Sequence, residues 1–274
     1  MKKIIRFTLI VLILITPSLV VAGGVRLKYK FVPGQKWECT RKSHMAFEVM
    51  GQKQVQRQKH TVLYTVSEGK KKGWVHLTAQ YINPPPKTPQ NQFSLGQYDL
   101  IFSADIHSSG DTRNIQVEDT KKSVNDPSLP PQMKAALEQN NKILAGSLKQ
   151  AVFWFSEVPD YALQPGDEFE EKRVEGVKTD AMSNKSKIRT IFELDDVSDG
   201  LAYFVTKQRS SSKMATQGGN MDFGSSGKGE IIFDIKEGMW IEYVSKSKMK
   251  FSGAMMGQGD QDMLITEKIS MLKR

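Results

Sequence analysis

Apolar and polar side chains alternate along most of this 274-residue chain. In residues 37–49, apolar side chains such as Trp37, Cys39 and Phe47 fall on odd positions, whereas most even positions are charged or polar. This period of two is typical of an antiparallel strand with one buried face. It recurs in six further segments: Gln54–Val66, Val75–Tyr81, Ile188–Leu194, Ile231–Ile235, Ile241–Phe251 and Met263–Met271. Glycine-containing turns lie between the segments, so the pattern predicts a mainly β (α+β) protein built on a meandering antiparallel sheet.

One segment has the periodicity of a helix instead. Between Pro131 and Phe155, apolar residues such as Met133, Leu137 and Leu144 are spaced by three, four or seven positions. This spacing predicts an amphipathic helix that packs against the sheet. The prolines at 130 and 131 suit its first turn, and Pro159 marks its end.

Two stretches predict loops. Asn83–Gln97 contains three consecutive prolines and few apolar residues, and Ser210–Lys228 is rich in Ser, Gly and Met. We expect both to be mobile connections.

The two halves of the chain resemble each other. Residues 32–38 (VPGQKWE) match residues 164–170 (QPGDEFE), and residues 104–106 (ADI) match residues 233–235 (FDI). The turn glycines Gly73 and Gly110 correspond to Gly200 and Gly238, and all four matches occur in order at offsets of 127 to 132 residues. The pattern predicts two copies of one sheet-forming unit, about 25–125 and 160–274, with the helix at 131–156 between them; chance similarity among common β-turns is the alternative. A duplicated meander would curl into one large, bent sheet.

The turn motifs at the two ends of the chain resemble those of a known group of proteins. An exported meander that opens with Pro-Gly-x-x-Trp at Pro33–Trp37 and closes with a hairpin over Gly229–Gly238 resembles secreted bacterial β-domains of unknown function. Their expected architecture is similar to the LolA/LolB-like half-barrels of bacterial lipoprotein carriers. That resemblance implies an antiparallel sheet wrapped around a helix, with an apolar cavity for acyl chains.

The N-terminus has the features of a secretory signal peptide. Lys2, Lys3 and Arg6 precede an apolar run over 7–22 that is shorter than the roughly 20 residues needed to span a bilayer. Val20 and Ala22 supply small residues before a cut near Ala22. We expect 1–22 to be removed, leaving a single exported β-rich domain over 23–274 without a transmembrane segment, in the periplasm or outside the cell. An uncleaved anchor is the alternative.

Charge and cysteine content narrow the class of protein further. Removing three basic residues from 39 leaves 36 Lys and Arg against 30 Asp and Glu, a net charge of +6. No dense basic and aromatic motif is present, so nucleic acid is not an expected partner. The single cysteine, Cys39, allows no internal disulfide, so we expect an ordinary hydrophobic core.

The sequence contains no recognisable catalytic or metal motif. His44, His60, His76 and His107 have no metal-ligand spacing, and Cys39 has no neighbouring ligand. No Gly-x-Ser-x-Gly elbow occurs, and the clustered carboxylates at 168–171 and 195–196 are typical of solvated strand ends. We expect no metal, no cofactor and no catalytic residues.

Adaptable apolar residues are the remaining signal. Several of the 13 methionines lie in or beside predicted loops, where a thioether can pack against irregular partners. We select Trp154, Phe155, Met255 and Met256 as candidate ligand-binding residues. The sequence predicts a non-enzymatic envelope or secreted binding protein that holds a lipid or other apolar ligand in a curved sheet. The alternative is a structural or protein-interaction module of the cell envelope with a filled core; a hydrolase of unrecognised type is a third hypothesis.

Overall fold

The computed structural model describes residues 24–49, 52–85, 94–122, 124–178, 182–216, 219–253 and 261–274. These residues form one antiparallel sheet of 11 strands, one α-helix and one 3₁₀ helix. The predicted fold class is therefore confirmed. The strands are β1 (Lys36–Val49), β2 (Gln52–Glu68), β3 (Trp74–Ile82), β4 (Leu100–His107), β5 (Thr112–Asp119), β6 (Glu168–Lys178), β7 (Met182–Ser198), β8 (Leu201–Thr216), β9 (Gly219–Asp234), β10 (Met239–Gly253) and β11 (Gln261–Lys273).

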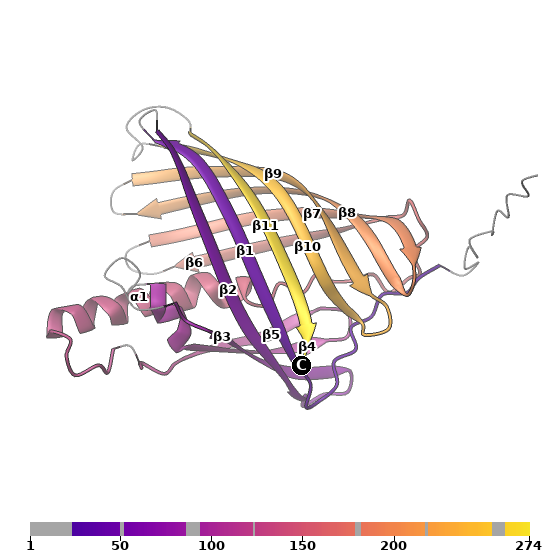
Figure 1. Cartoon of the computed structure of the whole chain (residues 1–274), viewed down its shortest axis with the longest axis horizontal. Helices are drawn as coiled ribbons and strands as arrows, with labels where there is room; N and C mark the ends of the chain where they lie inside the picture. Colours follow the sequence, from indigo (N-terminus) through magenta and orange to yellow (C-terminus); the bar gives the residue numbers. More distant parts are fainter. Residues whose placement is uncertain are drawn as a thin grey trace, which may run out of the picture.

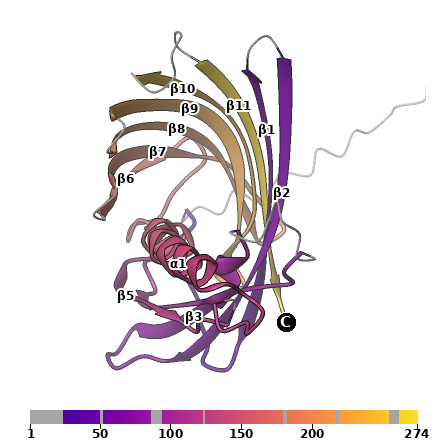
Figure 2. The ribbon, with the colours of Figure 1, turned by 90° about the vertical axis from the view of Figure 1, so that its left-hand side faces the viewer.

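The sheet consists of two meanders joined side by side. Its strand order is β5-β4-β3-β2-β1-β11-β10-β9-β8-β7-β6, so the first strand pairs with the last. The β1–β11 ladder runs from Trp37 opposite Lys273 to Phe47 opposite Met263. The sheet is strongly curved, and its two edge strands, β5 and β6, do not pair with each other (Figures 1 and 2).

The α-helix α1 (Pro131–Ala151) connects the two edges of the sheet. It contacts β4 and β5 on one side, β6 on the other, and the 3₁₀ helix η1 (Ser94–Asp99). Figure 2, which views α1 nearly along its axis, shows the sheet curling around it. The helix therefore lies inside the curve of the sheet, across the opening between the edges.

The helix ends earlier than its apolar spacing predicts. It stops at Ala151, and Trp154 and Phe155 belong to an extended segment. Three carbonyl oxygens of this segment accept hydrogen bonds from side chains that are remote in the chain. Tyr64 Oη donates to Val152 O at 2.5 Å, and Arg173 Nη2 donates to Phe155 O at 2.7 Å. Tyr29 Oη donates to Ser156 O at 2.9 Å. These bonds replace the helical ones, so tertiary contacts and not local periodicity end the helix. We call residues 152–159 the strap.

The prediction of a mobile loop at Ser210–Lys228 is wrong. This stretch forms the adjoining ends of β8 and β9, paired without interruption in the described residues from Leu201 opposite Asp234 to Thr216 opposite Gly219. Serine hydroxyls bond across the strands, with 2.7 Å between the Oγ atoms of Ser210 and Ser225. Small polar residues thus form strands here because β8 and β9 are each paired on both sides, β8 with β7 and β9, and β9 with β8 and β10. In the other predicted loop, Ser94–Asp99 forms η1; residues 86–93 lie outside the described residues.

The internal repeat is visible in matching backbone hydrogen bonds. Before β1, Gly34 N donates to Val66 O at 2.9 Å; before β6, Gly166 N donates to Leu194 O at 2.7 Å. The two turn glycines have φ of 89° and 91°. The two meanders therefore begin with the same turn, which bonds in each case to the second strand of the meander, β2 or β7.

Each copy also contacts the other through a reciprocal pair of bonds. Lys30 N donates to Gly238 O at 3.1 Å, and Val158 N donates to Ser109 O at 2.8 Å. Each bond joins the segment that leads into one copy to the hairpin turn of the other. The repeat is thus arranged with approximate two-fold symmetry, which sequence matching alone does not reveal.

The hydrophobic core fills the end of the curve nearest the turns at Gly110 and Gly238. Aromatic side chains dominate it, with Trp240 packed edge-to-face against Phe204 and Phe233 at centroid distances of 5.4 and 4.9 Å. Tyr29 and Phe155 complete it, at 5.7 Å from each other. All five side chains are at most 3% exposed.

In the described residues, no helix is long and apolar enough to cross a membrane. The predicted signal peptide at 1–22 lies outside the described residues.

Candidate functional site: a trough on the concave face

The sheet extends well beyond its core, and there its concave face has no helix over it among the described elements (Figures 1 and 2). In β9, partly buried and exposed residues alternate from Gly219 onward. The first fully buried residue of the strand is Ile231, near its end. The concave side chains of this extension are therefore partly accessible. This accessible surface is the candidate site.

Small side chains form the middle of the extension. They create a hollow because serine and glycine project little from the sheet. An added Cβ at Gly227 would lie 2.7 Å from Ser247 Cβ, so the bent sheet requires glycine at this point. We call this set the small-residue band: Ser186, Ser210, Ser212, Ser225, Gly227, Ser245 and Ser247.

An apolar band lies beyond the small residues, toward the far end of the strands. Its members are neighbours across the ladders: Met249 pairs with Met263, and Phe223 pairs with Phe251, their rings 5.3 Å apart. The band also adjoins the small residues, since Met249 lies opposite Ser225. All its side chains are partly buried: Phe47, Met214, Met221, Phe223, Met249, Phe251 and Met263.

Toward the core, two pockets flank Trp154. One of about 350 Å³ lies between the indole and the β1–β2 side, with Cys39, His60 and Ile265 in its wall. The other, of about 220 Å³, lies toward β7, with Ile188 in its wall. Ile188 pairs with Ser210 and Ile265 with Ser247, so both pockets open toward the small-residue band. We call the bands and pockets together the trough.

Two ion pairs line the pockets of the trough. Arg41 and Glu267 form an ion pair that lines both pockets. Arg173 Nη2 lies 2.7 Å from Glu171 Oε1 beside the second pocket. The trough therefore combines apolar side chains with two ion pairs near Trp154, and Glu175 adds a carboxylate to the second pocket.

Burial changes the ionisation of two groups in the wall. It raises the pKa of the Cys39 thiol to about 12, against a weaker opposing effect of the Trp154 indole N–H. Burial and the charge on Arg41 lower the pKa of His60, whose Nδ1 lies 3.0 Å from Gln97 Nε2. Both groups are therefore in their neutral forms at neutral pH.

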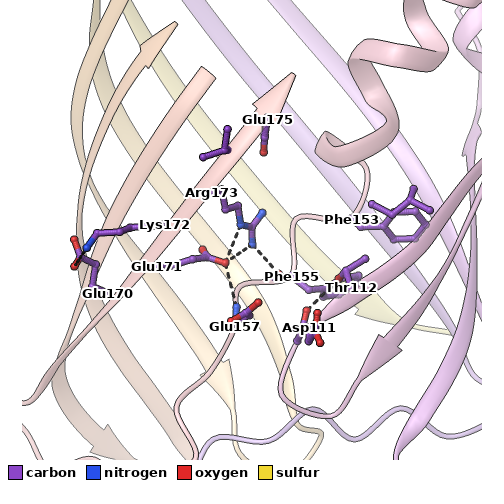
Figure 3. Close-up of a pocket in the computed structure, with 13 residues that line it drawn as sticks. Asp111, Thr112, Phe153, Phe155, Glu157, Glu170, Glu171, Lys172, Arg173 and Glu175 are labelled. Atoms are coloured by element: carbon purple, nitrogen blue, oxygen red, sulfur yellow. Dashed lines mark hydrogen bonds and ion pairs between the residues drawn. The ribbon is translucent and has the colours of Figure 1, made fainter. Parts of the chain in front are cut away.

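The strap closes the gap between the edge strands β5 and β6. Figure 3 shows its bonds to β6: Arg173 bonds to both Glu171 and Phe155 O, and Glu157 N donates to Glu171 Oε1 at 3.2 Å. A surface pocket of about 270 Å³ remains on this seam, with Phe153 and Phe155 on its apolar side. Side-chain bonds thus fix the strap to β6, and the backbone bond from Val158 N to Ser109 O fixes it to the turn before β5.

The structure places the predicted ligand-binding residues differently. Trp154 lies in the trough, whereas Phe155 is 3% exposed and contributes to the core and the seam. Met255 and Met256 lie outside the described residues. The predictions missed the methionines and phenylalanines of the apolar band as a set. The alternation of residues in 221–227 could have revealed them, but the low hydrophobicity of this segment makes the alternation weak.

Titratable side chains outside the trough occur as isolated pairs, whereas several share one pocket of the trough. Among the described residues, no group of three or more His, Cys, Asp or Glu side chains is arranged to hold a metal ion. His76 lies 3.0 Å from Asp105, and His107 lies 2.9 Å from Ser109, both away from the trough. Within the trough, Cys39, Arg41, His60 and Glu267 line the same pocket, where Arg41 forms its ion pair with Glu267.

No protein-family model and no curated protein matches the chain. Similar solved structures include one of lipid–protein interactions in lipovitellin (TM-score 0.45, 12% identity), covering 89% of this chain and 25% of the lipovitellin chain. The β domain of the Bordetella autotransporter BrkA (TM-score 0.40, 9% identity) matches over 87% of this chain and 99% of its own. The outer membrane protein OpdK of Pseudomonas aeruginosa (TM-score 0.26, 6% identity) matches over 88% and 98%.

This chain spans about a quarter of the lipovitellin chain. The expected resemblance to LolA/LolB-like carriers stays a prediction.

Proposed function

We propose that the mature protein is a non-enzymatic envelope or secreted binding protein that holds a lipid or other apolar ligand in the trough. The observation that carries the proposal is the continuity of the concave face. An apolar band, a hollow of small residues and two pockets beside Trp154 follow one another along the same strands.

The size and lining of the trough suit an acyl chain. Ligand pockets typically measure about 300–1,000 Å³ and are mostly apolar. The pockets of about 350 and 220 Å³ are of this order, before the open bands are added. Each methylene of a chain that is removed from water contributes about 0.8 kcal/mol.

The small-residue band does not oppose an apolar ligand. Ser186 Oγ donates to Ser212 Oγ at 2.8 Å, and Ser212 Oγ donates to Asn184 Oδ1 at 2.5 Å. Hydroxyls that already bond to each other lose little when water leaves, because a buried polar group is costly mainly when it is unsatisfied. The band therefore supplies space at a small desolvation cost.

The expected signal peptide supports the cell envelope or the exterior as the location of this function. The proposal needs no cofactor and no catalytic residue, because holding an apolar ligand requires only a surface that excludes water.

The direct test is native mass spectrometry of the protein purified from its own envelope, together with displacement of a fluorescent fatty acid. Co-purification of a lipid of defined mass is the expected result. A matched pair of variants locates the site: Ser210→Trp fills the trough, whereas Ser211→Trp places the same side chain on the outward face of the same strand. We expect Ser210→Trp to weaken fatty-acid binding by about tenfold or more, equivalent to about 1.4 kcal/mol, and Ser211→Trp to leave it unchanged.

A clean apo mass with no fatty-acid binding would reject the proposal. It would favour the structural or protein-interaction module, whose filled core needs no ligand. Equal loss of binding in both variants would place the ligand elsewhere.

A further inference from the structure

The outward, convex face of the sheet contains a depression lined by basic side chains. It measures about 710 Å³ and lies over β7 to β11, on the side of the sheet opposite the trough. Ser226 lies on β9, in the middle of the strands that line it, and its small side chain leaves room; the backbone at Gly227 also lines the depression. Six cationic residues line it, and we call the feature the basic depression: Arg189, Lys207, Arg209, Lys228, Lys246 and Lys248.

The cations stand directly opposite one another in the ladders. Lys207 pairs with Lys228, and Lys228 pairs with Lys246, which gives a row of three lysines across β8, β9 and β10. In the next row, Arg189 pairs with Arg209. Like charges in directly opposed positions destabilise a sheet. The fold therefore maintains an arrangement that opposes its own stability.

Ion pairs with acidic residues hold two of these cations, Lys207 and Arg189. Lys207 lies 3.1 Å from Glu193, and Arg189 forms an ion pair with Glu170. Arg209, Lys228 and Lys246 form no ion pair within the described part of the chain and are exposed. An anion bound in the depression would relieve this repulsion.

The same face carries a second row of cations. Lys42 lies opposite Lys268 on one side and Lys59 on the other. Only Lys268 has an acidic partner among these three in the described residues, with its Nζ 3.0 Å from Glu242 Oε2. Cations thus occur on this face from β7 to β2, too widely spread for one small anion, although the row of Lys42 and Lys268 continues through Val244 to the exposed Glu230.

Exposed aliphatic side chains border this basic surface. Leu264, in the wall of the depression, is 54% exposed, and Val55 on β2 is 57% exposed. Both lie in one row of the outward face, because Leu264 pairs with Ala46 and Ala46 pairs with Val55. No aromatic side chain lines the depression. Cations beside exposed aliphatic groups suit the headgroup region of a membrane, whereas single-stranded nucleic acid is held by stacking on aromatic rings.

We propose that the basic depression binds the phosphate groups of anionic lipids and docks the outward face of the sheet on a membrane surface. The inference is independent of the trough, since it concerns the opposite face and polar headgroups. In this arrangement the concave face points away from the docked surface.

The test is co-sedimentation of the mature protein with vesicles of phosphatidylcholine and phosphatidylglycerol, compared with vesicles of phosphatidylcholine alone. We expect binding only to the first kind, and weaker binding as salt is raised. The depression variant neutralises the cations that form no ion pair: Arg209→Gln, Lys228→Gln and Lys246→Gln. Each cation near an anionic surface contributes roughly fivefold to affinity, so this variant should bind about 100-fold more weakly.

The control variant also loses three positive charges, but outside the basic depression. Lys70→Gln, Lys71→Gln and Lys72→Gln neutralise the exposed turn between β2 and β3. We expect this variant to bind at least ten times more tightly than the depression variant, by the same conversion. Because opposed like charges destabilise the sheet, the depression variant should also melt at the same temperature as the native protein or above it.

Equal losses of binding in the two variants would show a general charge effect and overturn the proposal. Equal binding to vesicles with and without phosphatidylglycerol would overturn it too. So would binding of duplex DNA by the depression, at the same salt, with no binding to either kind of vesicle. A depression variant that melts at a lower temperature and retains vesicle binding would show that these cations have a structural role instead.

Discussion

The contact between the strap and Gly110, in the turn between β4 and β5, predicts how much Gly110→Ala destabilises the protein. The backbone of Ser156 passes directly over this glycine: a Cβ at position 110 would lie 2.4 Å from Ser156 O. The same carbonyl accepts the hydrogen bond from the buried Tyr29 hydroxyl at 2.9 Å. Gly110→Ala therefore tests whether the strap is fixed tightly across the open side of the sheet.

The expected cost has two parts. Gly110 has φ of +92°, where an alanine costs about 1–2 kcal/mol. The strap must also retreat by about 1 Å to restore an ordinary contact, and overpacking of this kind costs about 1–3 kcal/mol. We expect Gly110→Ala to lower the free energy of unfolding by about 2–5 kcal/mol, a large share of the roughly 5–15 kcal/mol typical of a folded domain.

Gly166→Ala is the matched control. Gly166 has φ of +91° but no atom within 4 Å of the added Cβ, so only the backbone cost of about 1–2 kcal/mol applies. Gly238→Ala should behave like Gly110→Ala, because its Cβ would lie 2.6 Å from Lys28 O. Urea unfolding followed by circular dichroism measures all three free energies. Equal losses at Gly110 and Gly166 would refute the reasoning, because they would show that the strap yields freely.

Two further predictions concern the wall of the trough. Cys39 is 4% exposed and its pKa is raised to about 12, so its thiol should react with a disulfide reagent at pH 8 much more slowly than a free cysteine. Trp154→Ala should accelerate this reaction by opening the pocket, and an unchanged rate would show that the indole does not cover Cys39. His60 has a lowered pKa in the folded state, so the unfolded state binds the proton more strongly and stability is lost as pH falls below about 6.5. His60→Gln should reduce this loss in urea unfolding between pH 7 and pH 5; an unchanged pH dependence would contradict the assignment.

The placement of Trp154 shows how far local patterns reach. Its selection as a ligand-binding residue followed from an apolar segment at 131–155, and the structure does place it in the trough. Its surroundings come from strands that are remote in the chain: Arg41 from β1 and Glu267 from β11. No spacing in the sequence could join these residues, because the pairing of the first strand with the last brings them together.

The alternation of apolar and polar residues by itself determined the class of fold, since a period of two buries one face of a strand whatever its neighbours are. Repeated Pro-Gly turns likewise predicted two related meanders, and both turn glycines, Gly34 and Gly166, do have the positive φ that favours glycine. The tertiary structure alone decided that Ser210–Lys228 is strand, since small polar residues have no strong preference of their own and follow the ladders on either side. It also decided that the helix ends at Ala151, where side chains of Tyr64 and Arg173 compete for the backbone. Both decisions shape the trough: the first gives it a floor of small residues, and the second places Trp154 between its pockets.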